Sequence, residues 1–332
     1  MRFAVLGGGS WGTALSQVLT DNGLKTIIYA KDLSVVTAIE KEHLNPRYFP
    51  SHLLPVSLKA TASLEKAVEN ADCFIIAVPT KAYRELLASL VPLMRKKALF
   101  LSVGKGFDPT TYQRLSCLIR EVVPEEKREA IVSLLGPSFA EEVIERKLTA
   151  LSAVSLDLKA AEKIQKAFSN NYLRVYTNED EIGAEYASAL KNVIALASGM
   201  MSGLGYGDNT RAALITRGLA EMSRFGVKKG GKMETYLGLT GLGDLLMTCN
   251  SLKSRNFQAG LMIGKDDSAA RFLKENKQTV EGVKTAEIIH IQASKEKVSM
   301  PIVDAVYAIL YEGQKPSQII NMLMSRSLKK EV

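Results

Sequence analysis

The chain opens with RFAVLGGGSWGTALSQVL, residues 2–19, in which an apolar run of strand length is followed by glycines and then by helical apolar spacing. Gly7, Gly9 and Gly12 follow the G-x-G-x-x-G pattern of dinucleotide-binding turns. The first glycine permits a tight turn, the second lets a pyrophosphate approach the backbone, and the third lets helix and strand pack closely. We therefore predict a dinucleotide site here, although a sharp turn that binds nothing would share the pattern.

Strand and helix patterns alternate over the first 178 residues. Strand-like apolar runs cover 25–30, 59–63, 73–78, 98–103, 131–135, 149–155 and 172–177. Helical spacing covers 33–43, 64–70, 81–90 and 158–169. This alternation is typical of a parallel, doubly wound sheet, whose ligands bind beyond the carboxyl ends of its strands. We predict an α/β fold with an N-terminal Rossmann-like domain over residues 1–178.

Strand patterns are absent after residue 180. Helical spacing covers 180–203, 210–225, 233–237, 243–249, 254–262, 268–275, 285–294, 302–312 and 316–325. We predict an all-α C-terminal domain over residues 179–332, with the ligand site between the two domains.

Composition restricts the classes of function. The 332 residues suggest two domains, and the 43 Lys and Arg against 35 Asp and Glu give a net charge of +8, which suits a phosphorylated substrate. Only the tail Arg326–Lys330 concentrates this charge, so we do not expect nucleic-acid binding. Three scattered cysteines without a C-x-x-C fit a reducing compartment, and we expect no metal site. With no predicted signal peptide or membrane span, we expect a cytoplasmic protein.

The chain has only 3 histidines, so an oxidoreductase of this sequence is expected to use a lysine as its acid/base group. Lys191 lies in the apolar stretch ASALKNVIALA, residues 187–197, where burial would favour a neutral amine and a general base. Lys105 lies between two glycines at the end of a predicted strand. The alternatives are a Lys191 that extends to the surface and a Lys105 in a solvated turn.

Two further stretches could bind a substrate. The glycine-rich loop 238–244 ends in Asp244, which could act in the site or cap the next helix. Ser254, Arg255 and Asn256 open another helix, where N–H groups and a guanidinium could bind a phosphate. An ordinary serine cap with a solvent-exposed arginine is the alternative.

Lys31 and Asp32 follow the second predicted strand, where selection of the adenosine ribose is usually made. Asp32 could accept a hydrogen bond from a ribose 2′-hydroxyl, and Lys31 could pair with a 2′-phosphate. One of them could instead simply begin the next helix. The choice between NAD and NADP therefore stays open.

Taken together, these motifs resemble those of the bacterial-type NAD(P)-dependent glycerol-3-phosphate dehydrogenases over essentially the whole chain. The matching stretches are GGGSWGTA (7–14), VPTK (78–81), GKG (104–106), GPSFAEE (136–142), ALKN (189–192), GLGYGDN (203–209), GLTGLGD (238–244), SRN (254–256) and VEG (280–282). The family often has two adjacent basic residues after the second strand, whereas this chain has Lys31 and Asp32.

The resemblance implies reversible hydride transfer between NAD(P)H and the dihydroxyacetone phosphate/glycerol 3-phosphate pair, which supplies glycerol 3-phosphate for glycerophospholipid synthesis. It implies that Lys191 is the proton acceptor, oriented by Asp244, with Asn192 and Thr248 in support. The implied substrate-binding residues are Lys105, Gly136, Ser138, Lys191, Asp244, Ser254, Arg255 and Asn256. The cofactor-binding residues, from the glycine motif and the resemblance, are Gly7, Gly9, Ser10, Trp11, Gly12, Lys31, Tyr48, Lys105, Ala140, Arg255 and Glu281.

Two other hypotheses remain at this point. One is another 2-hydroxy-acid or phosphosugar dehydrogenase of the same architecture, and the other is a dinucleotide-sensing protein without turnover. The sequence also leaves the oligomeric state open, with a homodimer as one option.

Overall fold

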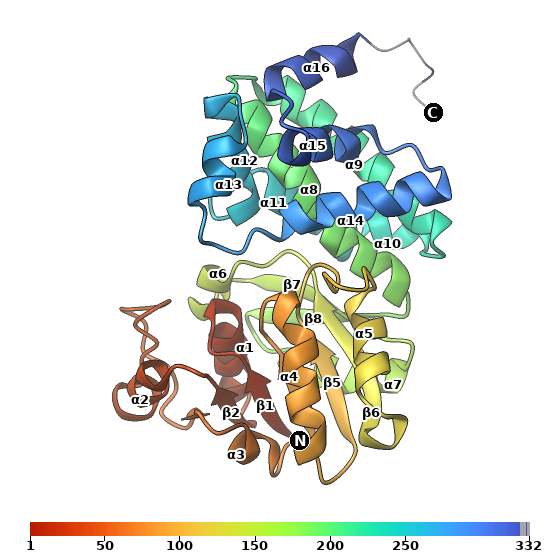
Figure 1. Ribbon diagram of the computed structural model, residues 1–332. Helices are drawn as coiled ribbons and strands as arrows, with labels where there is room; N and C mark the ends of the chain where they lie inside the picture. Colours follow the sequence, from red (N-terminus) through yellow and green to blue (C-terminus); the bar gives the residue numbers. More distant parts are fainter. Residues whose placement is uncertain (326–329, 331–332) are drawn as a thin grey trace. The chain divides into compact units, whose positions relative to one another are not determined.

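Eight strands form one sheet in the N-terminal part of the computed structural model, in the order β3-β2-β1-β4-β5-β6-β7-β8 (Figure 1). They are β1 (Arg2–Leu6), β2 (Lys25–Tyr29), β3 (Lys59–Thr61), β4 (Cys73–Ile76), β5 (Ala98–Ser102), β6 (Arg128–Leu135), β7 (Thr149–Val154) and β8 (Leu173–Asn178). The first six run parallel in the Rossmann order, so the predicted doubly wound sheet is confirmed for this part.

The last two strands differ from the predicted all-parallel arrangement, because β7 runs antiparallel to β6 and β8 is parallel to β7. The connection from β6 to β7 contains only the five-residue helix α6 (Ala140–Ile144). Such a helix is about 7.5 Å long, whereas the eight-residue β6 is about 26 Å long. No helix long enough to run back along β6 lies between the two strands, and β7 starts at the end of the sheet where β6 ends.

Helices cover both faces of the sheet because successive strand residues face opposite ways. In β1, Phe3 and Val5 belong to the core under α1 (Ser10–Asp21), α2 (Leu33–Glu42), α6 and α7 (Leu158–Phe168). Ala4 and Leu6 belong to the core under α3 (Leu64–Val68), α4 (Tyr83–Leu90) and α5 (Leu115–Val122). Short 3₁₀ turns complete this part at η1 (Thr80–Ala82), η2 (Val91–Leu93) and η3 (Glu125–Lys127).

Helix α5 is absent from the sequence-based prediction. Its apolar residues Leu115, Leu118, Ile119 and Val122 have the i, i+3, i+4, i+7 spacing of a helix that packs on one face. That spacing is the signal by which the helix could have been predicted.

Among the residues that the structure describes, all regular elements after β8 are helices, which confirms the predicted all-α fold of the C-terminal part. Its elements are α8 (Glu181–Gly203), α9 (Asp208–Lys228), α10 (Met233–Leu237), the π-helical turn η4 (Leu239–Gly243), α11 (Asp244–Cys249), α12 (Arg255–Asp266), α13 (Ala270–Glu275), α14 (Glu281–Glu296), α15 (Pro301–Tyr311) and α16 (Pro316–Met324). The chain divides into the compact units Met1–Glu185 and Tyr186–Val332, a division that falls inside α8. The structure describes residues 1–325 and 330, so most of the basic tail lies outside the described residues.

Glycines bring α8 and α12 into backbone contact. A Cβ built on Gly199 would lie 2.1 Å from the Phe257 carbonyl oxygen, and one on Gly260 would lie 2.1 Å from the Leu196 carbonyl oxygen. Any larger residue at these glycines would push the two helices apart. Helix α12 therefore packs tightly against one side of α8.

Glu221 of α9 is buried against the start of α15, where its two carboxylate oxygens accept the Ile302 N–H at 2.9 and 3.0 Å. Burial raises the pKa of Glu221 from 4.5 to about 7. Between these two values the folded protein binds the proton more tightly than the unfolded chain does. The free energy of unfolding should therefore fall as the pH rises through this interval.

We expect Glu221→Gln to remove that pH dependence, because an amide does not ionise. As the pH rises from about 5 to about 8, the unfolding free energy of wild type should fall by about 2–3 kcal/mol more than that of the variant. Urea unfolding at the two pH values measures the difference. Glu296→Gln is the control, since the exposed Glu296 has a pKa lowered by Lys229 and stays ionised over this range. A difference from wild type of the same size in both variants would contradict the assignment to Glu221.

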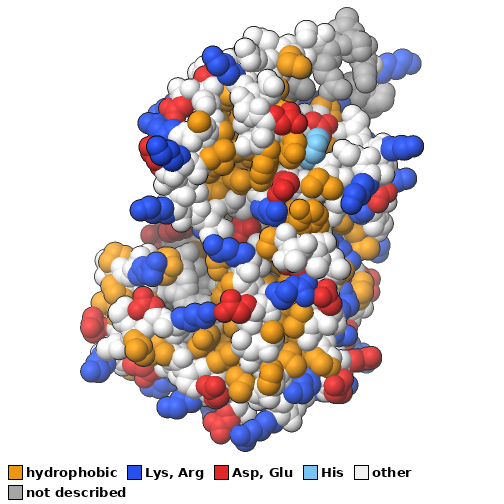
Figure 2. Space-filling model, viewed as in Figure 1, with side chains coloured by type: hydrophobic (Ala, Val, Ile, Leu, Met, Phe, Trp, Pro, Cys, Tyr) orange, Lys and Arg blue, Asp and Glu red, His pale blue; other side chains and the backbone are white. Residues whose placement is uncertain are grey.

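Four further observations concern the surface and the side chains. Basic and acidic side chains are interspersed on the face shown in Figure 2. Among the described residues, no helix is long and apolar enough to cross a bilayer, and no cluster of His, Cys, Asp or Glu could hold a metal ion. Cys73, Cys117 and Cys249 are free thiols.

Candidate active site

The glycine-rich turn has the geometry that a dinucleotide requires. Gly7 has a φ of +133°, and a Cβ on it would lie 2.4 Å from the Ala77 carbonyl oxygen. A Cβ on Gly12 would lie 2.1 Å from the Gly7 carbonyl oxygen, so α1 packs directly on the turn. At Gly9 a Cβ would meet nothing within 4 Å, which leaves the backbone open to a ligand. Gly7 and Gly12 are therefore required by the packing of the turn, and Gly9 leaves open the space in which the motif places a pyrophosphate.

Ser10 and Trp11 lie in the first turn of α1, whose N-cap is Gly9 and which has no side-chain cap. The Trp11 Nε1 is buried and has no hydrogen-bond partner. A buried indole N–H normally donates to an acceptor, and helix N-termini favour phosphate groups. These residues therefore fit NAD or NADP, which carries phosphate and ribose oxygens.

The residues after β2 are engaged with their neighbours. The Asp32 Oδ1 accepts the Ser34 N–H at 2.9 Å and the Ser34 hydroxyl at 2.7 Å, so Asp32 is the N-cap of α2. These bonds from Ser34 hold the pKa of the Asp32 carboxyl below its usual range. An Arg47 nitrogen lies 3.6 Å from Asp32, and Lys31 lies 3.4 Å from Glu85 on the surface. Asp32 thus begins the next helix, as one of the open alternatives supposed.

We expect Asp32→Ser to raise the ratio of kcat/KM for NADPH over NADH by about five- to tenfold, because a negative charge near a 2′-phosphate would be removed. Serine can still cap α2, which separates the charge from the cap. Initial rates with both cofactors measure the ratio. Asp157→Ser is the matched control, since Asp157 caps α7 through the Ala160 N–H at 3.1 Å. An unchanged ratio in Asp32→Ser would mean that this carboxylate does not act on the cofactor.

Three predicted substrate-binding residues lie around one carbonyl beyond β5 and β6. The Lys105 ammonium donates to the Gly136 carbonyl at 2.8 Å, and the Ser138 hydroxyl donates to the same oxygen at 3.3 Å. Gly136 has a φ of +132°, which favours glycine. Ala140 follows as the first residue of α6 and is buried. The structure therefore brings Lys105, Gly136 and Ser138 together.

Tyr83 supports this group and was not predicted from the sequence. It is fully buried, and its hydroxyl donates to the Ile76 carbonyl at 2.9 Å and accepts the Gly104 N–H at 2.9 Å. Tyr83 thereby links the ends of β4 and β5 next to Lys105. Its place shortly after the VPTK motif was the only sequence signal available.

Tyr48, another predicted cofactor contact, lies in the loop after α2 and is exposed. The guanidinium of Arg47 lies 5.8 Å from the centre of its ring. Glu281 is half-buried and is the first residue of α14 in the C-terminal unit.

Lys191 is buried in the middle of α8, with an exposed fraction of 3%. Its ammonium forms an ion pair with the Asp244 carboxylate and donates to the Thr248 hydroxyl at 2.9 Å. The Thr248 hydroxyl in turn donates to the Asp244 backbone carbonyl at 2.5 Å. Asp244 is fully buried, and its carboxylate pairs with the Lys191 ammonium. The N-cap position of α11 is occupied by Gly243, so Asp244 is not the cap. The structure therefore agrees with the predicted burial of Lys191 and joins it to Asp244 and Thr248.

Cys249 lies close to this pair. Burial raises the pKa of its thiol to about 12, so it stays protonated and unreactive near neutral pH. The thiol of Cys249 is therefore not a candidate for the acid/base group.

The SRN stretch divides into one exposed and two buried side chains. The Ser254 hydroxyl accepts the Phe257 N–H at 3.2 Å and caps α12. The Asn256 amide donates to the Asn192 side chain at 3.0 Å and accepts the Gly282 N–H at 2.9 Å, which links α8, α12 and α14. Arg255 is exposed at the first position of α12. Of these residues, Arg255 is the one whose charge can meet a ligand at the helix N-terminus.

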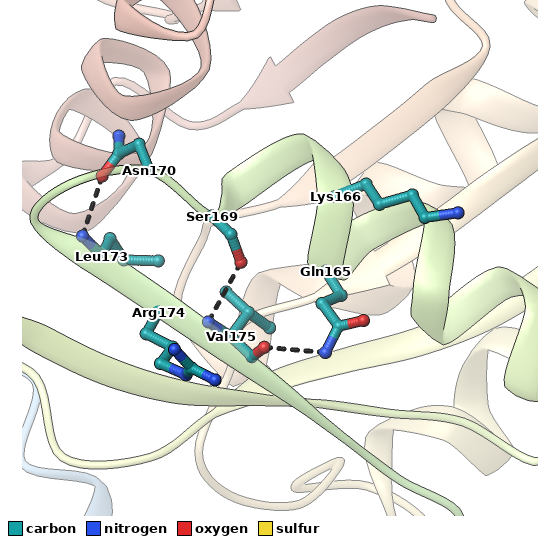
Figure 3. Close-up of a pocket in the computed structure, with 7 residues that line it drawn as sticks. All are labelled: Gln165, Lys166, Ser169, Asn170, Leu173, Arg174 and Val175. Atoms are coloured by element: carbon teal, nitrogen blue, oxygen red, sulfur yellow. Dashed lines mark hydrogen bonds between the residues drawn. The ribbon is translucent and has the colours of Figure 1, made fainter.

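A surface hollow between α7 and β8 contains none of the predicted site residues (Figure 3). It is lined by Gln165, Lys166, Ser169, Asn170, Leu173, Arg174 and Val175. Gln165 donates to the Val175 carbonyl at 2.9 Å, and Ser169 accepts the Val175 N–H at 3.2 Å. Gln165 and Ser169 thus bind the local backbone, and the hollow contributes nothing to the candidate active site.

Comparison with known proteins gives matches over nearly the whole chain. Residues 2–161 match the model of the NAD-dependent glycerol-3-phosphate dehydrogenase N-terminus, and residues 180–321 match that of the C-terminus. The glycerol-3-phosphate dehydrogenase [NAD(P)+] of Listeria innocua is 46% identical over 330 residues, 99% of this chain and 98% of that protein. The protein of the same name from Bacillus subtilis is 46% identical over 331 residues, 100% of this chain and 96% of that protein. The crystal structure of glycerol-3-phosphate dehydrogenase from Coxiella burnetii has a TM-score of 0.91 at 34% identity, covering 98% of this chain and 99% of that one.

Proposed function

The chain belongs to the family of NAD-dependent glycerol-3-phosphate dehydrogenases, and from this premise we propose which of its residues carry out the reaction. It is an NAD(P)-dependent oxidoreductase that interconverts dihydroxyacetone phosphate and glycerol 3-phosphate. When bound, the nicotinamide ring supplies or accepts the hydride. The protein must then bind the phosphate, hold the carbonyl carbon in place, and supply or remove one proton.

Lys191 exchanges that proton with the oxygen on C2 of the substrate. The observation that carries this assignment is the buried group Lys191–Asp244–Thr248, in which a single cation is held by a carboxylate and a hydroxyl. Two defined partners restrict rotation of the ammonium and so orient the nitrogen. Reduction of the ketone requires the ammonium as proton donor, and oxidation of the alcohol requires the neutral amine as acceptor.

Arg255 binds the substrate phosphate at the start of α12, where a guanidinium and helix N–H groups favour a dianion. Asn256 and Ser254 keep that helix start in place through the bonds to Asn192, Gly282 and Phe257 described above. Lys105 adds a second positive charge beside Gly136 and Ser138 and serves both substrate and cofactor. We propose that the residues around Arg255 and the residues around Lys105 take part in the same reaction.

The cofactor is held by the glycine-rich turn together with the other contacts that the resemblance to the family implies. These are Gly7, Gly9, Ser10, Trp11, Gly12, Lys31, Tyr48, Lys105, Ala140, Arg255 and Glu281. We further propose that the enzyme acts in the cytoplasm and supplies glycerol 3-phosphate for glycerophospholipid synthesis. Assembly as a homodimer is one option, which sedimentation equilibrium would decide.

Absorbance of the reduced cofactor tests the proposal. Dihydroxyacetone phosphate should be reduced with NADH and NADPH side by side, while unphosphorylated dihydroxyacetone should be a poor substrate. A panel of 2-hydroxy acids and phosphosugars distinguishes other dehydrogenases of this architecture. Binding of NADH without turnover of any substrate would instead indicate a dinucleotide sensor.

A further inference from the structure

Asn45 lies at the start of the loop that carries Tyr48, and its side chain is fully buried. The amide nitrogen donates to the Gly8 carbonyl at 3.1 Å and to the Thr13 hydroxyl at 2.8 Å. Because a carbonyl oxygen can only accept, the nitrogen is the end of the amide that faces Gly8. One side chain thus links the middle of the glycine-rich turn to the first turns of α1.

The backbone of Asn45 closes the Tyr48 loop. Its carbonyl accepts the Tyr48 N–H at 3.1 Å and the Phe49 N–H at 2.8 Å. Phe49 is buried in the core on that face of the sheet. The same residue therefore holds two segments that are far apart in sequence, the glycine-rich turn and the loop with the exposed Tyr48.

The bond to Gly8 also sets the orientation of the next amide. A trans peptide is planar, and its C=O and N–H point in opposite directions. With the Gly8 carbonyl held toward Asn45, the Gly9 N–H points away from Asn45. Gly9 is the open position of the turn and the N-cap of α1. Asn45 therefore determines which way a backbone donor points at the place where a pyrophosphate would approach.

We propose that Asn45 is a positioning residue for the dinucleotide, holding the Gly8–Gly9 peptide and the Tyr48 loop in the geometry that binds it. The proposal rests on the proposed use of this turn by NAD(P)H. The position requires an amide, because the Asn45 Oδ1 is buried without a partner and the whole contribution comes from the nitrogen. A carboxylate of the same shape would place a lone pair against the Gly8 carbonyl.

Asn45→Asp tests the proposal with the change of a single group. Trp11 is the only tryptophan of the chain and lies in the first turn of α1, so its fluorescence reports NADH binding directly. The variant should raise the Kd for NADH by at least about tenfold, equivalent to about 1.4 kcal/mol. At saturating NADH, kcat and the KM for dihydroxyacetone phosphate should stay within about twofold of wild type.

Asn22→Asp is the matched control at the other end of α1. The Asn22 amide donates to the Ala167 carbonyl at 2.8 Å, so the substitution removes a similar bond away from the turn. It should lower the melting temperature and leave the Kd for NADH unchanged. Thr13→Val removes the second partner of Asn45 and should raise the Kd by about threefold. It provides a test even if Asn45→Asp does not fold.

Two outcomes would overturn the inference, and they can be told apart. If wild type binds NADH and both Asn45→Asp and Thr13→Val bind it equally well, Asn45 has only a structural role. If wild-type Trp11 fluorescence does not respond to NADH and no NADH binds by calorimetry, the proposed function fails along with the inference.

Discussion

Lys191→Met should lower kcat by roughly 10²–10⁴-fold, the usual contribution of general acid–base catalysis. Methionine keeps approximately the length and volume of lysine, but its thioether has no proton to exchange with the substrate. Both kcat and kcat/KM should fall, because the lost interaction belongs to the transition state. NADH binding should remain nearly unchanged. The measurement is the rate of dihydroxyacetone phosphate reduction under conditions in which chemistry limits turnover.

The same substitution leaves Asp244 buried without its ion-pair partner, which destabilises a protein by about 3–5 kcal/mol. The double variant Lys191→Met, Asp244→Asn removes the unpaired charge and should recover much of the stability without recovering activity. Lys166→Met, an exposed lysine on α7, is the control for the substitution itself and should leave kcat unchanged.

Retention of more than about a tenth of the wild-type kcat by Lys191→Met would contradict the assignment, given the magnitude expected for such catalysis. The role would then pass to Lys105, the other lysine among the proposed substrate-binding residues. In wild type, oxidation should become faster and reduction slower as the pH rises through the titration of the catalytic amine. Loss of these opposite pH profiles in the variant would identify Lys191 as the group that titrates.

Arg255→Ala should raise the KM for dihydroxyacetone phosphate by roughly 30- to 150-fold, because a charge-assisted contact to phosphate contributes about 2–3 kcal/mol. Arginine presents a planar fork of donors to the phosphate oxygens, which alanine and water replace poorly. Initial rates over a range of substrate concentrations measure the change. The slow turnover of unphosphorylated dihydroxyacetone should be little affected, because that substrate has no phosphate to lose.

Arg271→Ala is the control, since Arg271 is paired with Asp266 on the surface of the same unit. It should leave KM unchanged, as exposed ion pairs contribute little. Wild type that turned over dihydroxyacetone as well as its phosphate would show that no residue of this chain selects the phosphate. An unchanged KM in Arg255→Ala alone would move the phosphate contact to another cation.

The sequence by itself determined the parts of this protein that depend on local patterns. Gly7, Gly9 and Gly12 indicated the dinucleotide turn. Gly7 and Gly12 make backbone approaches that only glycine permits, and Gly9 leaves open space beside the backbone. Alternating strand and helix periods predicted all eight strands, and helical spacing predicted the helices of the C-terminal unit. The apolar neighbours of Lys191 predicted its burial, and motif similarity to a family supplied the list of site residues.

The tertiary structure decided everything that depends on which distant segments meet. The antiparallel direction of β7 was decided by the tertiary structure, because the apolar pattern of a strand does not say which way it runs beside its neighbour. Asp244 could have been a helix cap or a partner of Lys191, and only the packing of α8 against α11 shows the latter. The sequence left open whether Asp32 caps a helix or binds the ribose, and its hydrogen bonds to Ser34 show the cap. The hydrogen bond from Asn45 to Gly8 joins residues far apart in sequence, so no local pattern indicated it. Local periodicity reports backbone geometry and burial, whereas hydrogen-bond partners far apart in sequence are set by how the elements pack.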